Sequence, residues 1–155
     1  MKIKIIGLLC LVSSLAVYAQ NIPVQITLKD GRSMKAHHFG QVDCSGKTYF
    51  DNYILVKGKY NNLITELKDY SKVSRIELID FDEPSKLTGD NEKGQIIVSK
   101  KNGVSVTLED ATITLSCYGI DEKINQLQFQ MINPLTDKID ELKLDTKDIV
   151  SIEFL

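Results

Sequence analysis

The sequence predicts an all-β protein made of two tandem copies of a unit of about 60 residues, each a small five-stranded barrel or a strongly bent sheet. Three observations predict this class. Apolar and polar residues alternate with a period of two through most of the chain, as in strands with one face on a core. Short turns that contain glycine interrupt these runs, and the order of strands and turns occurs twice.

The first 19 residues have the layout of a secretory signal peptide. Lys2 and Lys4 precede an apolar run, Ile5 to Val17, and the small residue Ala19 stands where cleavage is expected. This run is shorter than the ~20 residues that a membrane-spanning helix needs. We therefore expect residues 1–19 to be removed, and the mature chain to be periplasmic or secreted, without a membrane span.

Two segments of the mature chain match each other in order and spacing, residues 20–81 and residues 95–155. The matching positions are Gly31 with Gly103, Cys44 with Cys117, and the stretch ELKDYSKVSRIEL with ELKLDTKDIVSIEF. Residues 82–94 between them are polar and predict a linker. The pattern indicates a duplicated β-rich unit, which one chain of this length can hold as two very small domains.

Five strands are expected in the first copy. They are Val24 to Lys29, Ser33 to Cys44, Tyr49 to Lys57, Leu63 to Lys68 and Val73 to Phe81. Each is an alternating or apolar run bounded by turn residues. Whether the two copies close separately or merge into one sheet system is left open by these patterns.

The second copy repeats this order, with one irregularity in its second strand. The residues Val104, Val106 and Leu108 share one face, whereas Ala111, Ile113, Leu115 and Cys117 share a face of the opposite parity. One extra residue accounts for the change, and we predict a β-bulge near Glu109 and Asp110. Further strands follow around the alternating LQFQM, around Leu142 and Leu144, and at the IVSIEF ending.

The hairpin VQITLKDGR, Val24 to Arg32, resembles the first hairpin of Sm-like and related SH3-like barrels. The endings VSRIEL and IVSIEF resemble the last strand of these barrels. The resemblance implies a small curled barrel for each copy. Sm-like proteins that bind RNA carry an Arg-Gly turn before the last strand, and this chain has DYSK and DTKD there, so the resemblance implies a shape and not RNA binding. The chain is also similar, more loosely, to small exported bacterial envelope proteins.

The charge of the chain argues against nucleic acid as a partner. The formal net charge is −2, and two of the lysines lie in residues 1–19, so the mature part is nearer −4. No block of basic residues is present to neutralise phosphates.

One segment, HHFGQVDC, combines residue types that ligate metals or carry nucleophilic chemistry. Its candidates are His37, His38, Asp43 and Cys44. Adjacent strand residues point to opposite faces, and residues six apart lie roughly 20 Å apart along a straight strand. We therefore predict no metal, no cofactor and no catalytic residues, and keep a metal-binding or thiol-dependent role for this segment as the alternative.

The two cysteines of the mature chain, Cys44 and Cys117, occupy matching positions in the two copies. Export would place them where disulfides persist. Equivalent residues near a two-fold axis meet each other, so a bridge between the copies is one expectation. Two buried free thiols are the other.

Aromatic residues gather in the first copy, and three tyrosines are candidates for a binding face, Tyr49, Tyr53 and Tyr60. A tyrosine offers a flat apolar ring with a polar end, which suits a peptide or a glycan. Packing into the core is the alternative for these residues.

Together these features predict an exported, non-catalytic binding or scaffolding module of the bacterial cell envelope. Its partner would be a protein, a peptide or a glycan. A second alternative is a structural subunit that oligomerises through its edge strands.

Overall fold

The computed structural model describes residues 22–37, 53–81, 93–117 and 120–155, without the side chains of Tyr53, Cys117 and Asp121. The predicted signal peptide and most of the predicted linker lie outside these ranges. Within the described part the protein is all-β, as predicted, with a single 3₁₀ turn, η1 (Thr146–Asp148). No helix in these ranges is long and apolar enough to cross a membrane.

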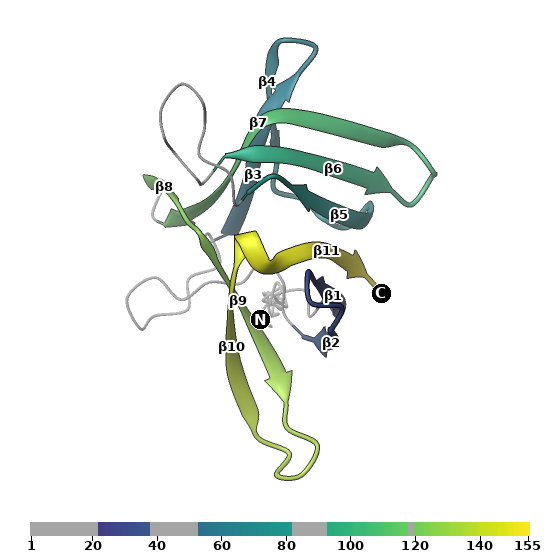
Figure 1. The fold of residues 1–155 in the computed structure, drawn as a ribbon, viewed down its shortest axis with the longest axis vertical. Coiled ribbons are helices and arrows are strands. Elements are labelled where there is room, and N and C mark those ends of the chain that lie inside the picture. The colour runs from purple at the N-terminus through teal and green to yellow at the C-terminus, as the bar shows by residue number, and fades with distance from the viewer. Residues whose placement is uncertain (1–21, 38–52, 82–92, 118–119) are drawn as a thin grey trace, which may run out of the picture.

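The described residues between 22 and 81 contribute five strands, and those between 93 and 155 contribute six (Figure 1). The first five are β1 (Val24–Leu28), β2 (Ser33–Ala36), β3 (Tyr53–Tyr60), β4 (Leu63–Leu67) and β5 (Val73–Ile79). The others are β6 (Gly94–Lys100), β7 (Ser105–Cys117), β8 (Ile120–Lys123), β9 (Gln126–Ile132), β10 (Ile139–Asp145) and β11 (Ile149–Phe154). Strands are present at the expected places as far as these are described: the predicted strands Ser33–Cys44 and Tyr49–Lys57 lie partly outside the described ranges, at residues 38–52. The strand β3 extends three residues beyond its predicted end at Lys57, and β8 was not predicted.

Nine of these strands form one sheet in the order β2-β1-β11-β5-β6-β7-β3-β4, with β8 paired to β7. All of its pairings are antiparallel. The remaining two strands, β9 and β10, form a hairpin of their own. The backbone of His37 joins the two sheets, because its N–H donates to the Gln130 carbonyl at 2.7 Å and its carbonyl accepts from the Gln130 N–H at 3.2 Å.

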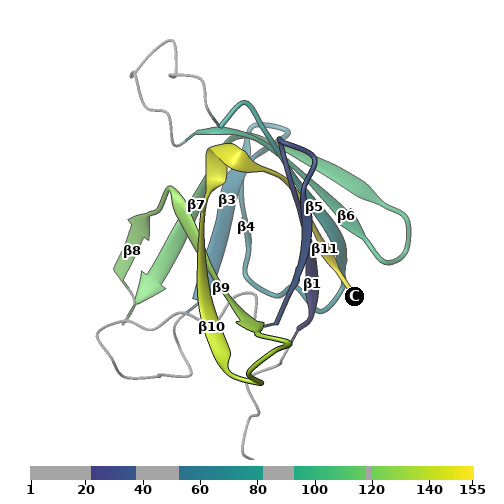
Figure 2. The ribbon, with the colours of Figure 1, turned by 60° about the horizontal axis from the view of Figure 1, so that its bottom comes forward.

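Of the two shapes expected for each copy, the closed barrel is not found in the described residues, where the sheet stays open. The reason is the placement of the last strand of each half. The strand β5 lies between β11 and β6, and β11 lies between β1 and β5. Neither strand pairs with a strand of its own half, so neither half closes on itself, and the halves share one sheet (Figure 2).

The β1–β11 pairing and the β6–β5 pairing have corresponding registers. In β1–β11 the partners are Val24 with Phe154, Ile26 with Ile152 and Leu28 with Ile149. In β6–β5 they are Ile96 with Leu78, Val98 with Ile76 and Lys100 with Val73. Both pairings skip one residue at the same place, and the central pair between β5 and β11 is Ile76 with Ile152.

The hairpins β1–β2 and β6–β7 also turn in the same way. Gly31 and Gly103 have φ values of 85° and 86°, in the left-handed region that favours glycine. Each glycine N–H donates at 3.0 Å to the carbonyl oxygen of the last residue of the preceding strand, Leu28 or Lys100. A three-residue loop with glycine in this position is a common hairpin connection, as Lys-Asp-Gly and Lys-Asn-Gly predicted.

The predicted bulge in β7 is confirmed. Between β6 and β7 the paired residues change from Ile96–Leu108 to Gly94–Ala111. The chain therefore advances three residues along β7 for two residues along β6, which is one extra residue on β7. Asp110 has a φ of 48°, which a short polar side chain tolerates. The slip turns Ala111 and Ile113 to the core side, where both are buried.

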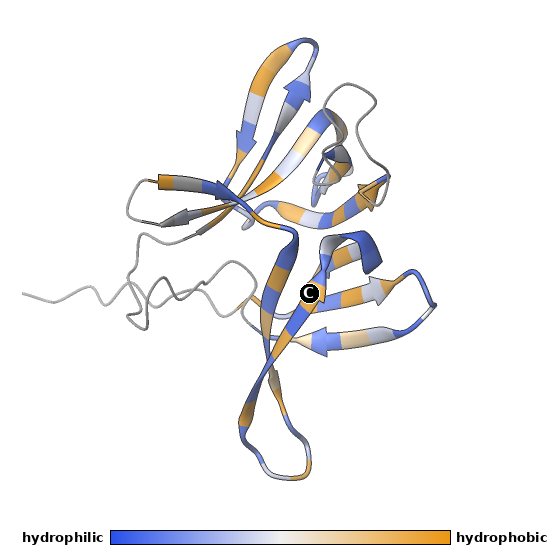
Figure 3. Cartoon of the chain, turned by 60° about the vertical axis from the view of Figure 1, so that its left-hand side comes forward, coloured by the Kyte–Doolittle hydropathy of each residue, from blue (hydrophilic) through white to orange (hydrophobic). Residues whose placement is uncertain are grey.

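One core joins both halves. Its members include Ile26, Ile76, Ile96, Phe129 and Ile152, none of them more than 1% exposed. Apolar and polar residues alternate along the strands (Figure 3), and the burial pattern places the apolar ones on the core face. Tyr70 belongs to this core: its hydroxyl donates to the Ile54 carbonyl at 2.6 Å, and its ring stacks on Phe154 with centroids 5.6 Å apart.

Replacing Gly94 with alanine is expected to lower the free energy of unfolding by about 2–3 kcal/mol, because the new Cβ has no room. It would collide with the Ile79 carbonyl oxygen and lie 2.7 Å from the Phe81 ring. Gly31→Ala serves as the comparison, since a Cβ there meets nothing within 4 Å and costs only the left-handed φ, about 1 kcal/mol. Denaturant unfolding of both variants measures the difference, and equal losses would contradict the packing argument.

Candidate functional site

Among the described residues, most of the exposed large apolar side chains lie at the ends of two hairpins. On β3–β4 these are Tyr60, Leu63 and Ile64, and on β9–β10 they are Ile132, Leu135 and Ile139. Leu63 and Ile64 are 71% and 70% exposed, and Leu135 is 91% exposed. The two hairpins project from opposite ends of the molecule, and apolar residues lie close to the end of each (Figures 1 and 3).

The local sequence explains why these hairpins are well formed at their ends. Asn61 and Asn62 make a two-residue turn with φ values of 50° and 63°, a conformation that asparagine adopts more readily than most residues. In the other hairpin the Asn133 side chain accepts a hydrogen bond from the Leu135 N–H at 2.9 Å, and Asn133 and Lys138 close the loop at 2.8 Å. The apolar side chains are therefore held on ordered turns.

The outer strands of these hairpins are sheet edges within the described ranges. There β4 pairs with β3 alone, and β10 pairs with β9 alone. An edge strand presents backbone N–H and C=O groups to which another strand can be added. Each hairpin thus combines exposed apolar side chains with an edge.

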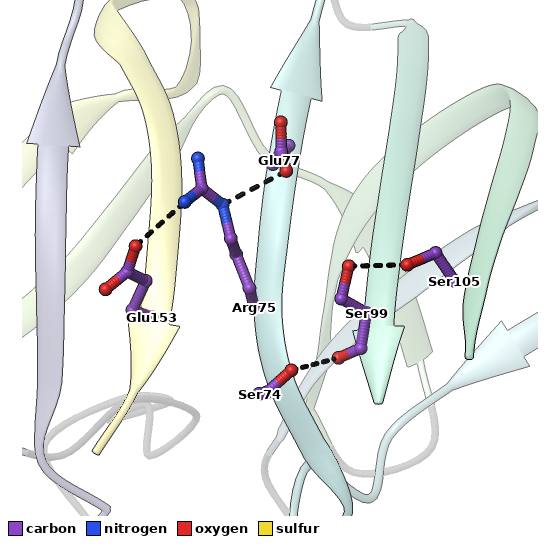
Figure 4. A network of polar contacts seen from close by, with 6 residues as sticks. All are labelled: Ser74, Arg75, Glu77, Ser99, Ser105 and Glu153. Atoms are coloured by element: carbon purple, nitrogen blue, oxygen red, sulfur yellow. Dashed lines mark hydrogen bonds and ion pairs between the residues drawn. The ribbon is translucent and has the colours of Figure 1, made fainter. Parts of the chain in front are cut away.

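The polar face at the centre of the sheet has a charged cluster around Arg75 (Figure 4). The Arg75 Nη1 donates to the Glu153 carboxylate at 2.8 Å across the β5–β11 pair. Its Nε lies 3.0 Å from the Glu77 carboxylate, although the angle there does not make a hydrogen bond. Arg75 therefore lies between two glutamates, its cross-strand partner Glu153 and Glu77 two residues along its own strand.

Replacing Arg75 with glutamine is expected to lower the free energy of unfolding by about 1 kcal/mol, because Glu77 and Glu153 would then repel each other across two strands. All three side chains are roughly 34–40% exposed, so solvent screens the effect. The double variant Arg75→Gln with Glu153→Gln removes the repulsion and should be more stable than the single one. A double variant no more stable than Arg75→Gln would contradict this role.

An ion pair ties the β3–β4 hairpin to the bulge of β7. The Lys59 Nζ donates to the Asp110 carboxylate at 2.8 Å. This hydrogen bond, and then the charge of Lys59, lower the pKa of Asp110 below its ordinary value of 3.8. The same contact raises the pKa of Lys59. Both groups are solvated, so the pair fixes the position of the hairpin more than it stabilises the fold.

This pair predicts a pH-dependent effect of Lys59→Gln. Because the pKa of Asp110 is lowered on folding, the pair stabilises the fold above the ordinary carboxyl pKa of 3.8 and ceases to do so as the pH falls below it. The melting temperature of Lys59→Gln should thus lie below that of the unmodified protein at pH 7 and approach it at pH 2–3. The control is Lys35→Gln, at an exposed lysine of β2. A deficit for Lys59→Gln that persists undiminished at pH 2 would refute this effect.

An open depression of about 330 Å³ lies where β8 and β9 approach β7. Its apolar lining residues are Ile54, Leu115, Ile124 and Leu127, and its polar ones include Glu122, Gln128 and Lys143. A wall of mixed apolar and amide groups suits a short peptide segment better than a metal ion. Among the described residues no group of three or more His, Cys, Asp or Glu side chains is placed to hold a metal.

Most residues of the HHFGQVDC segment lie outside the described part, including His38, Asp43 and Cys44. His37 is half-buried, and its backbone forms the bridge to Gln130 described above. Cys117 is the last residue of β7. The metal or thiol alternative and the Cys44–Cys117 bridge both stay predictions.

Of the three candidate tyrosines, the two within the described ranges do not lie together. Tyr53 and Tyr60 are the first and last residues of β3, about 23 Å apart along a strand with a 3.3 Å rise. Tyr60 is half-exposed beside Leu63. Tyr49 lies outside the described ranges. Of this predicted face, Tyr60 joins the exposed end of β3–β4.

The exposed apolar residues of the two hairpin ends were not predicted from the sequence. The sequence placed Leu63 and Ile64 at the start of an expected strand, Leu63 to Lys68, without assigning either side chain to a face. The dipeptide Asn61-Asn62 directly before them marked a tight turn, and apolar residues next to such a turn lie at the tip of a hairpin. That juxtaposition was the available clue.

Comparisons with known proteins give no relative. No protein-family model, no curated protein and no solved structure matches the chain. The resemblance to Sm-like and SH3-like barrels therefore stays a prediction.

Proposed function

We propose that the protein is an exported, non-catalytic binding or scaffolding module of a bacterial cell envelope, and that it binds protein through the ends of β3–β4 and β9–β10. The observation that carries the proposal is the exposure of Leu63, Ile64, Leu135 and Ile139 on two ordered turns. Large apolar side chains gathered on an exposed surface mark interaction sites. Adjacent edge strands add a means of backbone recognition.

We further propose that the chain is a tandem duplication whose two copies have exchanged their last three strands, β3–β5 for β9–β11, since β3 also pairs with β7 and β9 meets the end of β2 at the His37–Gln130 bridge. The equal registers of β1–β11 and β6–β5, the two glycine turns and the central Ile76–Ile152 pair support this history. The exchange places β3–β4 and β9–β10, the equivalent hairpins of the two copies, at opposite ends. A duplicated module with two outward hairpins suits a scaffolding role.

Export and its consequences are part of the same proposal. The layout of residues 1–19 supports secretion, and an oxidising compartment would allow a bridge between Cys44 and Cys117. Such a bridge would join the equivalent second strands of the two copies.

Site-specific photo-crosslinking in the producing cells tests the proposal. A photoreactive residue is placed at Leu63 or Leu135, and at Asn102 on the β6–β7 turn as the matched exposed control. We expect protein adducts from the first two positions and few from Asn102. Equal yields at all three positions, or none at the hairpin ends, would contradict a protein-binding role for these ends.

A further inference from the structure

We propose that the partner of each hairpin end is a second copy of this chain, joined head to tail: β3–β4 of one copy docks on β9–β10 of the next. This rests on the proposed function and names its partner. Three observations on the described residues carry it, namely the apolar ends, the charges beside them and the directions in which the hairpins point.

The apolar ends match in size and in construction. Each presents three large apolar side chains, Tyr60 with Leu63 and Ile64 on one hairpin and Ile132 with Leu135 and Ile139 on the other. Ile132 and Ile139 form a cross-strand pair, as do Tyr60 and Leu63, so each end has a compact apolar pair beside its turn. Burying two such ends together would remove both from water.

The charges beside the ends differ. The β3–β4 strands carry Lys57 and Lys59 against Glu66, with Lys57 paired to Glu66 at 3.2 Å and Lys59 paired to Asp110 of β7 at 2.8 Å. The β9–β10 hairpin with its loop has an excess of two acids, since it carries Asp137, Asp140, Glu141 and Asp145 against Lys138 and Lys143. A contact between two β9–β10 hairpins would bring two acidic hairpins together, whereas the head-to-tail contact places the acidic hairpin beside one with no excess of acid.

The directions of the hairpins allow the same arrangement. The two hairpins project from opposite ends of the molecule (Figure 1). Both β4 and β10 run from the tip of their hairpin toward the body, so hairpins that approach tip first bring β4 and β10 together antiparallel. A contact between unlike surfaces at opposite ends repeats from copy to copy and builds an open chain or a ring.

The experiment uses the full chain, with one variant for each end. The head variant, Leu63→Glu with Ile64→Glu, places acids against the acidic β10. The tail variant, Ile132→Lys with Ile139→Lys, places lysines against the apolar end of β3–β4. The control is Val104→Glu, a half-exposed residue of the β6–β7 turn away from both ends. Circular dichroism checks that all three fold, and sedimentation velocity from about 1 to 200 μM measures association.

The unmodified protein and Val104→Glu should associate increasingly with concentration. The head and tail variants alone should each bind themselves at least about tenfold more weakly. A 1:1 mixture of the two should form a dimer and nothing larger, because one intact head meets one intact tail.

Three results would overturn the proposal: an unmodified protein that stays monomeric, a tail variant that associates as well as the unmodified protein, or a mixture that does not dimerise. The crosslinking experiment separates this failure from that of the proposed function. Adducts of twice the mass of the chain indicate self-assembly, whereas adducts with a different protein keep the binding role and exclude the second copy as its partner.

Discussion

Replacing Ile152 with alanine is expected to lower the free energy of unfolding of the whole chain by about 2–5 kcal/mol. Ile152 is 1% exposed and lies on β11, between Ile26 of β1 and Ile76 of β5. The cavity would open at the junction of the two halves, where β11 has no neighbour from its own half to fill it. Total stabilities of small domains are only about 5–15 kcal/mol, so this single change is large.

The same loss is expected for Ile76→Ala, because Ile76 and Ile152 are cross-strand partners at the centre of the sheet. Because the two residues are in contact, their effects should not be additive: the loss of unfolding free energy in the double variant should differ from the sum of the two single losses by at least about 0.5 kcal/mol. Leu155→Ala, at an exposed position after β11, is the control and should change little. Chemical denaturation followed by fluorescence and circular dichroism measures all four. Two separate transitions, with only one shifted by each substitution, would show that the halves fold independently.

Separating the halves is expected to abolish folding altogether. In a fragment of residues 22–81, β5 would lack both of its neighbours, β11 and β6, and β1 would lose β11. In a fragment of residues 93–155, β11 would lack both β1 and β5. Each fragment would expose the core face of its last strand, and a unit of about 60 residues has little apolar burial to spare.

We expect each fragment alone to give the poorly dispersed NMR spectrum of an unfolded chain, and an equimolar mixture to recover the spectrum of the intact protein. The mixture is the control for damage to the fragments. A cooperative thermal transition in either fragment alone would show that its last strand can pair with its own first strand, and would contradict the shared sheet.

Local features of this fold were predictable from the sequence because nearby residues determine them. The alternation in VQITL and VSRIEL placed β1 and β5, and the glycines of Lys-Asp-Gly and Lys-Asn-Gly placed two turns. The change of parity around Asp110 located the bulge, since one extra residue moves every later side chain to the other face.

The partner of each last strand was not predictable in this way. The sequences of β5 (VSRIELI) and β11 (IVSIEF) have nearly the same alternation of apolar and polar residues. Each of the two strands pairs with the first strand of the other half, β6 or β1, in the corresponding register. A pattern of this kind specifies the face of a strand and its register, but it does not distinguish the first strand of one half from that of the other. Of the two shapes expected for each copy, a small barrel or a strongly bent sheet, the closed barrel was wrong for this reason.

The candidate site was missed for a related reason. Periodicity assigns Leu63 and Ile64 to a strand. They are exposed because this strand, β4, lies at the edge of the sheet and they stand beside its turn, which periodicity does not predict. The charged cluster at Arg75 was also hidden, because Arg75 and Glu153 are 78 positions apart and meet only through the pairing of β5 with β11. Sites that depend on non-local pairing follow from the topology.

The most direct test of the exchanged strands is a set of proton–proton NOEs in the ¹³C,¹⁵N-labelled protein. The structure predicts cross-strand NOEs from Ile26 to Ile152 and from Val98 to Ile76, the partners in β1–β11 and β6–β5. NOEs from Ile26 to Ile76 and from Val98 to Ile152 as direct cross-strand partners would mean that each half closes on itself, and would contradict the shared sheet and the placement of the two hairpins that depends on it.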